Sequence, residues 1–154
     1  MRLTLRTNLA MRALMYCAAH DDRLVTKAEI ARACNASENH LAQVINALGQ
    51  SGFLATQRGR SGGMRLGAAA EDITVGRVFR EFEAETPFTE CFSRTDNSCP
   101  ISGRCLLKNA LENALAAFYA TLDKVTLADL LDDPAALAHL RNLTGTQHDL
   151  ACRV

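Results

Sequence analysis

Apolar residues recur at helical spacing along most of the chain. The first stretch predicts a helix over residues 7–20, because four apolar residues follow the i, i+4, i+7, i+8 spacing of one buried face: Leu9, Ala13, Tyr16 and Cys17. Thr26-Lys27-Ala28-Glu29 then has the spacing of a capping box, in which a hydroxyl and a carboxylate satisfy free backbone N–H groups. It predicts a short helix from Lys27 to about Cys34.

A third helix is predicted after Ser37, whose hydroxyl can cap it. Its apolar residues again share one face: Leu41, Val44, Ile45 and Leu48. Two short helices separated by the tight connection Asn35-Ala36, after an opening helix, are typical of a helix-turn-helix.

The next segment predicts a β-hairpin. Residues 53–56 and 64–66 have the character of short strands, and the segment between them is rich in Gly and Arg. A hairpin with a basic, glycine-rich tip, directly after a helix-turn-helix, has the form of a wing.

The second half of the chain contains one long periodic stretch. Thr74 is predicted to cap a helix that ends before Pro87, and residues 88–104 show no periodicity. From Cys105 an apolar stripe covers about five turns: Leu107, Ala110, Leu111, Ala114, Leu115, Phe118 and Leu122. A long helix that leaves a small domain commonly pairs with its symmetry mate, so we expect a homodimer. A last short helix is predicted over residues 127–131.

These elements predict a mainly α-helical protein with a small β wing, built as a winged helix-turn-helix domain plus a long dimerisation helix. We divide the chain into the DNA-binding domain (1–86), a cysteine-bearing loop (87–105), the dimerisation helix with the C-terminal helices (106–144) and a tail (145–154). A chain of 154 residues is long enough to form a hydrophobic core without disulfides or a structural metal.

Charge is distributed unevenly although the formal net charge is zero. The first 80 residues contain 11 Lys and Arg against 6 Asp and Glu, and the remainder contains 6 against 11. A basic front half suggests a module that faces a polyanion. No stretch is apolar enough to span a bilayer, and no apolar segment follows the N-terminus, so we expect a cytoplasmic protein without a membrane partner.

Polar residues on the third helix and in the wing are the candidates for DNA contact. Asn and Gln side chains can read adenine in the major groove, whereas Arg residues in a glycine-rich loop can approach phosphates or the minor groove. A solvated polar helix face is the alternative for the helix alone, but the wing and the basic half favour double-stranded DNA. The candidates are Ser37, Asn39, His40, Gln43, Asn46, Arg58, Arg60, Ser61, Gly62 and Arg65.

Three of the six cysteines lie in the non-periodic segment. Cys91, Cys99 and Cys105 have the spacing C-x7-C-x5-C. Thiolates are soft ligands that select iron–sulfur clusters, zinc or copper(I), and the C-x2-C pairs common in zinc sites are absent. Three unrelated cysteines and a dithiol redox switch are the alternatives.

The remaining cysteines suggest structural roles. Cys17 and Cys34 fall on apolar helix faces and are predicted to be small core residues, and Cys152 is predicted to lie in the tail as a free thiol. No nucleophile–base pair, phosphate loop or paired carboxylates stand out, so we do not expect an enzyme. An electron-transfer or cluster-carrier protein is the alternative from another class, although electron carriers usually ligate their cluster with four cysteines.

Residues 1–131 resemble the Rrf2 family of winged-helix iron–sulfur regulators, typified by IscR, NsrR and RirA. The resemblance is carried by the opening Met1-Arg2-Leu3-Thr4, the segment 58–67, the three cysteines before a long helix, and the segment 126–131. It implies a homodimer that crosses its long helices, two wings on a palindromic operator, and a cluster near the dimer interface.

Within the family the resemblance points to two kinds of repressor. Segments 37–46, 78–83 and 122–131 are similar to the nitric-oxide-sensing NsrR group, whereas the cysteine spacing and segment 15–19 are equally similar to the iron-responsive RirA group. We predict nitric oxide as the signal, with iron as the alternative, and a four-iron rather than a two-iron cluster.

The fourth ligand departs from the family pattern. NsrR-like proteins can supply it as an Asp on the first helix of the partner subunit, and the matching residue here is Asn8. A carboxamide is a poorer iron ligand than a carboxylate, so Glu85, Glu90, Asp96 and water stay as further candidates. Arg12, one turn beyond Asn8, could position an acidic ligand instead.

Overall fold

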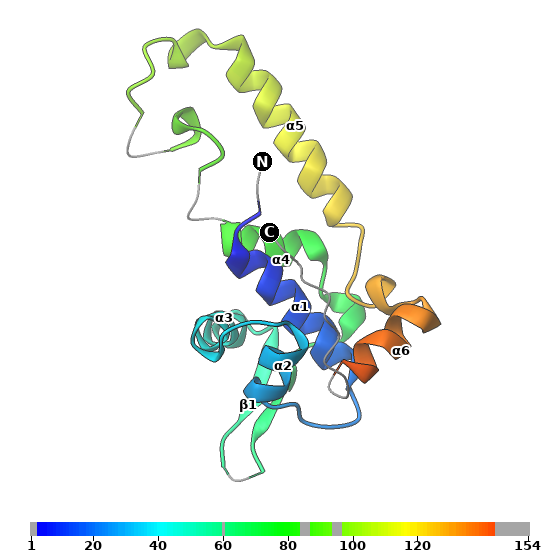
Figure 1. Ribbon diagram of the computed structural model, residues 1–154. Coiled ribbons are helices and arrows are strands. Elements are labelled where there is room, and N and C mark those ends of the chain that lie inside the picture. The colour runs from blue at the N-terminus through cyan, green and yellow to red at the C-terminus, as the bar shows by residue number, and fades with distance from the viewer. Residues whose placement is uncertain (1–2, 60, 84–86, 94–96, 144–154) are drawn as a thin grey trace.

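The computed structural model describes residues 3–59, 61–83, 87–93 and 97–143 (Figure 1). It consists of helices and one two-stranded antiparallel sheet, which confirms the predicted mainly α fold with a small β wing. Short 3₁₀ turns at 70–72, 90–92, 102–104 and 129–131 connect the main elements. These elements are α1 (Leu5–Ala19), α2 (Lys27–Ala33), α3 (Glu38–Gln50), β1 (Leu54–Gln57), β2 (Gly63–Leu66), α4 (Val75–Glu83), α5 (Leu106–Leu122) and α6 (Pro134–Asn142).

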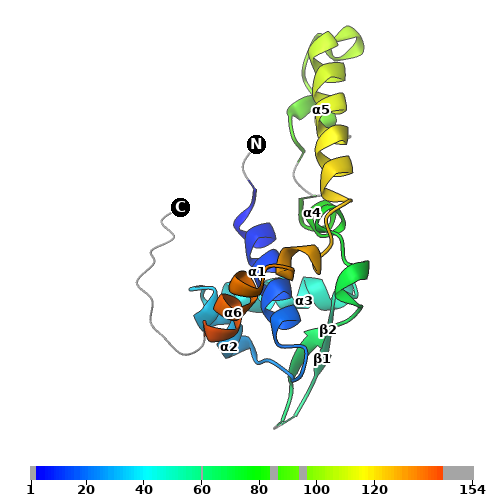
Figure 2. The same ribbon diagram turned by 90° about the vertical axis from the view of Figure 1, so that its right-hand side faces the viewer.

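Helix α1 forms the centre of the core and contacts α2, α3, α4 and α6. Its buried face includes Leu14 and Tyr16, both inaccessible to solvent or nearly so. The helix begins two residues earlier than predicted, because the Thr4 hydroxyl accepts a hydrogen bond from the backbone N–H of Thr7 and so caps the first turn. Figure 2 shows α6 lying along α1.

The helix-turn-helix has the predicted limits and caps. Thr26 and Glu29 form the complete capping box of α2, and the Ser37 hydroxyl accepts the N–H of His40 at the start of α3. Asn35 takes a left-handed conformation, with φ of 48°, in the connection. The four predicted apolar residues of α3 are all buried in the core: Leu41, Val44, Ile45 and Leu48.

The wing is a hairpin in which β1 and β2 pair from Leu54 opposite Leu66 to Gln57 opposite Gly63. A further pairing fixes its base, because Val25 and Met64 exchange backbone hydrogen bonds of 2.9 and 2.8 Å. The segment before α2 therefore holds the wing next to the helix-turn-helix.

The predicted helix over residues 127–131 is wrong. Thr126 and Asp129 bond each other through side chains and backbone N–H groups, only a 3₁₀ turn follows, and α6 begins at Pro134 with Asp133 as its cap. Proline disfavours a helical conformation in the residue before it and is well placed in a first helical turn. One helix therefore cannot run through this segment, and a new one begins at Pro134. The predicted tail from residue 145 lies outside the described residues.

Within the part of the chain that the structure describes, none of the helices has the length and hydropathy needed to cross a membrane.

Candidate DNA interface and cysteine loop

The polar candidates on α3 share an exposed side of the helix. Asn39, His40, Gln43 and Asn46 are all exposed, opposite the face that packs against α1 and α2. An ion pair of 3.2 Å joins Glu38, the first residue of α3, to Lys27 of α2. Rigid packing behind the helix and free side chains in front of it suit a helix that enters a groove.

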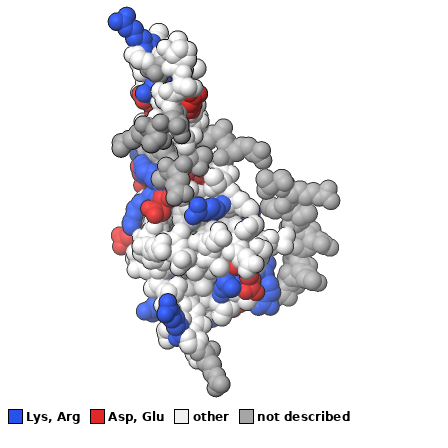
Figure 3. All heavy atoms as spheres, turned by 90° about the vertical axis from the view of Figure 1, so that its left-hand side faces the viewer, with Lys and Arg blue, Asp and Glu red and all other residues white. Residues whose placement is uncertain are grey.

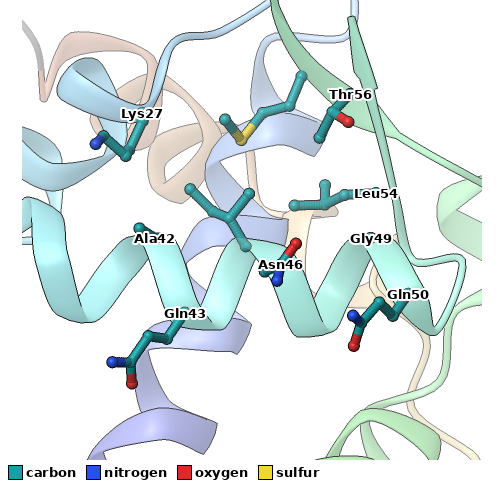
Figure 4. Close-up of a pocket in the computed structure, with 10 residues that line it drawn as sticks. Lys27, Ala42, Gln43, Asn46, Gly49, Gln50, Leu54 and Thr56 are labelled. Carbon is teal, nitrogen blue, oxygen red and sulfur yellow. The ribbon is translucent and has the colours of Figure 1, made fainter.

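A groove of about 770 Å³ runs between α3 and the wing. Figure 4 shows Lys27 of α2 near one end of α3 and Leu54 and Thr56 of β1 near the other. Its apolar residues are Ala42, Ile45, Leu54 and Met64, and its polar ones are Lys27, Gln43, Asn46, Gln50 and Thr56.

The sequence interpretation missed three of these polar residues. Gln50 lies seven residues after Gln43, the spacing that returns to one helix face, and this signal was available. Thr56 lies two residues after Leu54 on β1 and so shares its face of the sheet, and it is exposed whereas Leu54 is buried. Lys27 had no such signal, because its place beside α3 depends on tertiary packing.

The wing presents exposed polar and basic side chains. Arg58, Ser61 and Arg65 are exposed, and Arg60 lies outside the described residues. Gly62 donates its N–H to the carbonyl of Gly59 at 3.0 Å, and a Cβ at Gly62 would lie 2.4 Å from the carbonyl oxygen of Gln57, so no other residue fits there without a shift. Figure 3 shows basic side chains near this end of the molecule as well as along the rest of the same face.

The cysteine loop joins the end of α4 to the start of α5. Cys91 lies in a 3₁₀ turn with its Sγ 3.1 Å from the Thr89 hydroxyl, and Cys105 directly precedes α5. The Glu90 carboxylate accepts two hydrogen bonds of 2.6 Å from the backbone N–H and hydroxyl of Ser98. These bonds lower the pKa of Glu90 and bring the segments that carry Cys91 and Cys99 side by side.

The donor set fits an iron–sulfur cluster by its chemistry. Cys91, Cys99 and Cys105 are free thiols of intermediate exposure, and soft sulfur ligands suit iron. The described residues do not gather three possible metal ligands around one point. Among the candidates for a fourth ligand, Asn8 is exposed on α1 and Glu90 is bonded to Ser98, whereas Glu85 and Asp96 lie outside the described residues.

Cys17 and Cys34 are buried in the core, as predicted. Burial raises the pKa of the Cys17 thiol to about 12, with a smaller contribution from Cys34, and raises the pKa of Cys34 to about 11. Such thiols stay protonated and unreactive at neutral pH.

A carboxylate connects the end of α4 to the start of α1. Glu83, the last residue of α4, accepts hydrogen bonds from the backbone N–H of Thr4 at 2.9 Å and from its hydroxyl at 3.0 Å. It also accepts one from the hydroxyl of Thr7, which is fully buried. Further along α1, Arg12 donates a hydrogen bond to the carbonyl of Cys34 at 3.2 Å, beside the turn of the helix-turn-helix.

A helix-turn-helix with an exposed polar second helix, followed by a hairpin with a basic tip, defines a winged-helix DNA-binding regulator. Residues 3–133 match the family model described as "Rrf2: Iron-dependent Transcriptional regulator". The chain belongs to the Rrf2 family, which is a family of transcriptional regulators and not of enzymes.

The comparisons with individual proteins agree with this family. The chain is 42% identical over 141 residues to "HTH-type transcriptional regulator NsrR" of Geobacillus kaustophilus, covering 91% of this chain and 96% of that protein. It is 45% identical to the NsrR of Bacillus subtilis, covering 85% and 90%. Among solved structures, IscR of T. potens matches with a TM-score of 0.70 at 26% identity, covering 86% of this chain and 88% of that one.

Proposed function

We propose that this protein is a dimeric, cytoplasmic repressor that responds to nitric oxide through an iron–sulfur cluster. The observation that carries the proposal is the similarity to NsrR-named regulators over nearly the whole of both chains. It extends through the cysteine loop and α5, so it is not limited to the DNA-binding domain.

The DNA-binding part of the proposal assigns two roles. The exposed side chains of α3, Asn39, His40, Gln43 and Asn46, read base edges in the major groove. Arg58, Arg60 and Arg65 of the wing bind the backbone or the minor groove, with Ser61 and Gly62 shaping its tip and Ser37 fixing the start of α3. The groove on the protein beside α3 has room for the DNA sugar–phosphate backbone that lies between the major and the minor groove.

The sensing part assigns Cys91, Cys99 and Cys105 as ligands of the cluster, with the fourth position left to Asn8, Glu85, Glu90, Asp96 or water. When bound, the cluster supplies iron that reacts with nitric oxide. Glu90 and Ser98 hold two of the cysteine segments together, and Glu83 links the end of α4 to α1. Because α1 packs against α3, a rearranged loop shifts the recognition helix through these contacts.

Dimerisation is assigned to α5. The helix buries none of its own residues in one chain, although its sequence carries a continuous apolar stripe. A second copy that covers the stripe places two recognition helices on successive major grooves, about 34 to 36 Å apart.

Iron itself is the second candidate signal. The matching family model is described as iron-dependent, and three thiolates with a replaceable fourth ligand lose iron more readily than a site closed by four cysteines. In that case chelation rather than nitric oxide relieves repression.

One experiment separates these signals. The full chain, purified without oxygen, is assayed for iron, sulfide and visible absorption, and then titrated with nitric oxide or an iron chelator while DNA binding is followed on one duplex. That duplex is selected from a random pool by the cluster-loaded protein.

We expect stoichiometric nitric oxide to bleach the chromophore and to weaken DNA binding by about thirtyfold or more, the effect of about 2 kcal/mol. Loss of binding on chelation alone favours the iron-responsive function. A protein that binds neither iron nor sulfide after reconstitution refutes the cluster and favours a cluster-free thiol sensor, which is checked by reversible disulfide formation among the loop cysteines.

A further inference from the structure

Helix α5 is fixed to the body at its C-terminal end. Shortly after it, Val125 and Leu127 pair with the residues around the start of α4, with backbone bonds of 2.9 Å from Val75 N to Val125 O and 2.8 Å from Leu127 N to Ile73 O. Leu127 is fully buried. At the opposite end, Leu106 and Leu107 are 82% and 66% exposed, and Figures 1 and 2 show α5 extending away from the body. The direction of α5 is therefore set where it meets α4.

One arginine of α4 holds this meeting point. The guanidinium of Arg80 forms two hydrogen bonds of 2.6 Å with the two carboxylate oxygens of Asp123, the C-cap residue of α5. It also lies over the ring of Tyr119, one turn earlier on α5, at 4.6 Å from the ring centroid. A planar guanidinium that is both bidentate and stacked restrains the rotation of one helix against the other.

Gly76 brings the helices together independently of charge. It lies one turn before Arg80 on α4, and a Cβ there would be 2.2 Å from a carboxylate oxygen of Asp123 and 2.9 Å from its backbone nitrogen. Backbone at 2.9 Å cannot be moved aside as a flexible side chain can, so any larger residue displaces the end of α5.

The side chains of Arg80 and Asp123 are 48% and 40% exposed, and half-exposed pairs add little stability. Their geometry matters more, because a small change of angle at this end of α5 becomes a larger displacement at its far end. A helix of 17 residues is about 25 Å long, and a tilt of about 5° moves its far end by about 2 Å. In a symmetric dimer the two displacements add to about 4 Å, which is slightly more than one base-pair step of about 3.4 Å.

We propose that Arg80, Asp123 and Gly76 are positioning residues that set the distance between the two recognition helices, and thereby select operators by the spacing of their half-sites. This inference rests on the proposed dimeric regulator and adds a determinant of its specificity.

The test compares half-site spacing preference among variants of the full, cluster-loaded chain. The probes are the duplex selected by the wild-type protein, the same duplex with one base pair added or removed at its centre, and a single half-site. The variants are Arg80→Gln and Gly76→Ala, which disturb by different means the contact of α4 with Asp123, called the junction below. The matched control is Arg77→Gln, which removes the same charge from α4 at a residue that lies over Phe53 instead of α5.

We expect the wild type and Arg77→Gln to prefer the selected spacing by about tenfold, or about 1.4 kcal/mol. Both junction variants should reduce this preference to less than about threefold while their half-site affinity stays within about twofold. A preference that is unchanged in Arg80→Gln overturns the proposal. An equal loss on half-site and full site also overturns it, because that pattern indicates damage to the DNA-binding domain.

A double-mutant cycle tests the pair itself. Asp123→Asn combined with Arg80→Gln should reduce the spacing preference no more than either change alone, and additive losses contradict a shared role. A wild-type chain that selects no duplex, or that sediments as a monomer, refutes the proposed function and with it the positioning role of the junction. A wild-type dimer that binds all spacings equally refutes only the positioning role of the junction.

Discussion

The body built from α1 to α4 and the long helix α5 contain similar apolar stripes that meet different surroundings. In α1 and α3 the stripe is buried, and Leu14 and Leu41 are inaccessible to solvent. In α5 no residue is buried, and Leu107 at its start remains two-thirds exposed. Periodicity alone therefore predicts a helix and its apolar face, but whether the face packs within the chain depends on the tertiary fold. The unpacked stripe is what the proposed symmetry mate covers.

The cysteines fall into two groups, one buried in the body and one in the loop before α5. Cys17 and Cys34 pack in the body as small apolar groups, whereas Cys91, Cys99 and Cys105 stay partly accessible in the loop before α5. The first pair contributes to stability and the second set is available for chemistry, so matched substitutions in the two groups should have opposite effects.

The largest expected effect is the loss of the cluster in Cys99→Ser. We expect iron and sulfide to fall to background, because two remaining thiolates do not close the site, while the free energy of unfolding of the metal-free protein changes by less than about 0.5 kcal/mol. Cys17→Ser should do the reverse, keeping the iron but lowering stability by about 1 to 3 kcal/mol through a buried hydroxyl. Iron analysis and urea unfolding of both variants check this, and retained iron in Cys99→Ser would exclude it as a ligand.

The next effect compares one substitution at two leucines. Leu14→Ala should lower the free energy of unfolding by about 2 to 5 kcal/mol, because it leaves a cavity in a packed core. Leu107→Ala should change it by less than about 0.5 kcal/mol in dilute protein, and should instead weaken self-association. Urea unfolding at several protein concentrations, with sedimentation, measures both. A dimer of unchanged affinity in Leu107→Ala would place the interface away from this end of α5.

The sequence was sufficient to predict the body because its signals are local. Capping at Thr26 and Ser37, the apolar face of α3 and the hairpin all depend on residues within a few positions of each other, and the structure confirms them. The predicted helix over residues 127–131 failed because the segment forms only a 3₁₀ turn before Pro134, and Leu127 is buried there by pairing with Ile73, a contact between distant segments that periodicity does not encode.

The site was predictable to a lesser extent for the same reason. The exposed polar residues of α3 follow from its buried face, but Lys27 reaches the groove only through packing of α2 on α3. The bidentate contact between Arg80 and Asp123 joins residues 43 positions apart and has no local signature. The cysteine ligands remain a prediction, because spacing in a non-periodic loop indicates a donor set without fixing its geometry.

A third effect should appear at alkaline pH. Burial raises the pKa of Cys17 to about 12 and of Cys34 to about 11, above the ordinary value of 9.0 that applies once the chain unfolds. As the pH rises, the thiols ionise first in the unfolded chain. Their contribution to the free energy of unfolding is therefore constant below pH 9, and it falls between pH 9 and about 11 to 12. Each thiol contributes at most about 1.4 kcal/mol per pH unit.

The double variant Cys17→Ala with Cys34→Ala isolates these thiols from other alkaline groups. Its unfolding free energy should fall less steeply than that of the wild type above about pH 9, when both are measured by urea unfolding in parallel. Parallel slopes for the wild type and the double variant would show that the buried thiols ionise in the folded chain as readily as in the unfolded one.

The smallest expected effect separates the basic wing from the rest of the charged surface. Arg58→Ala should reduce the slope of log affinity against log salt by about 0.9, the value expected when one phosphate is no longer neutralised. Lys124→Ala, an exposed cation just after α5, should leave the slope unchanged because that end of the helix lies away from the wing. Fluorescence titrations between about 50 and 200 mM salt resolve the difference, which amounts to about three- to fourfold in relative affinity. Equal slopes for Arg58→Ala and the wild type would remove Arg58 from the interface, and a reduced slope for Lys124→Ala would show that the DNA footprint extends toward α5.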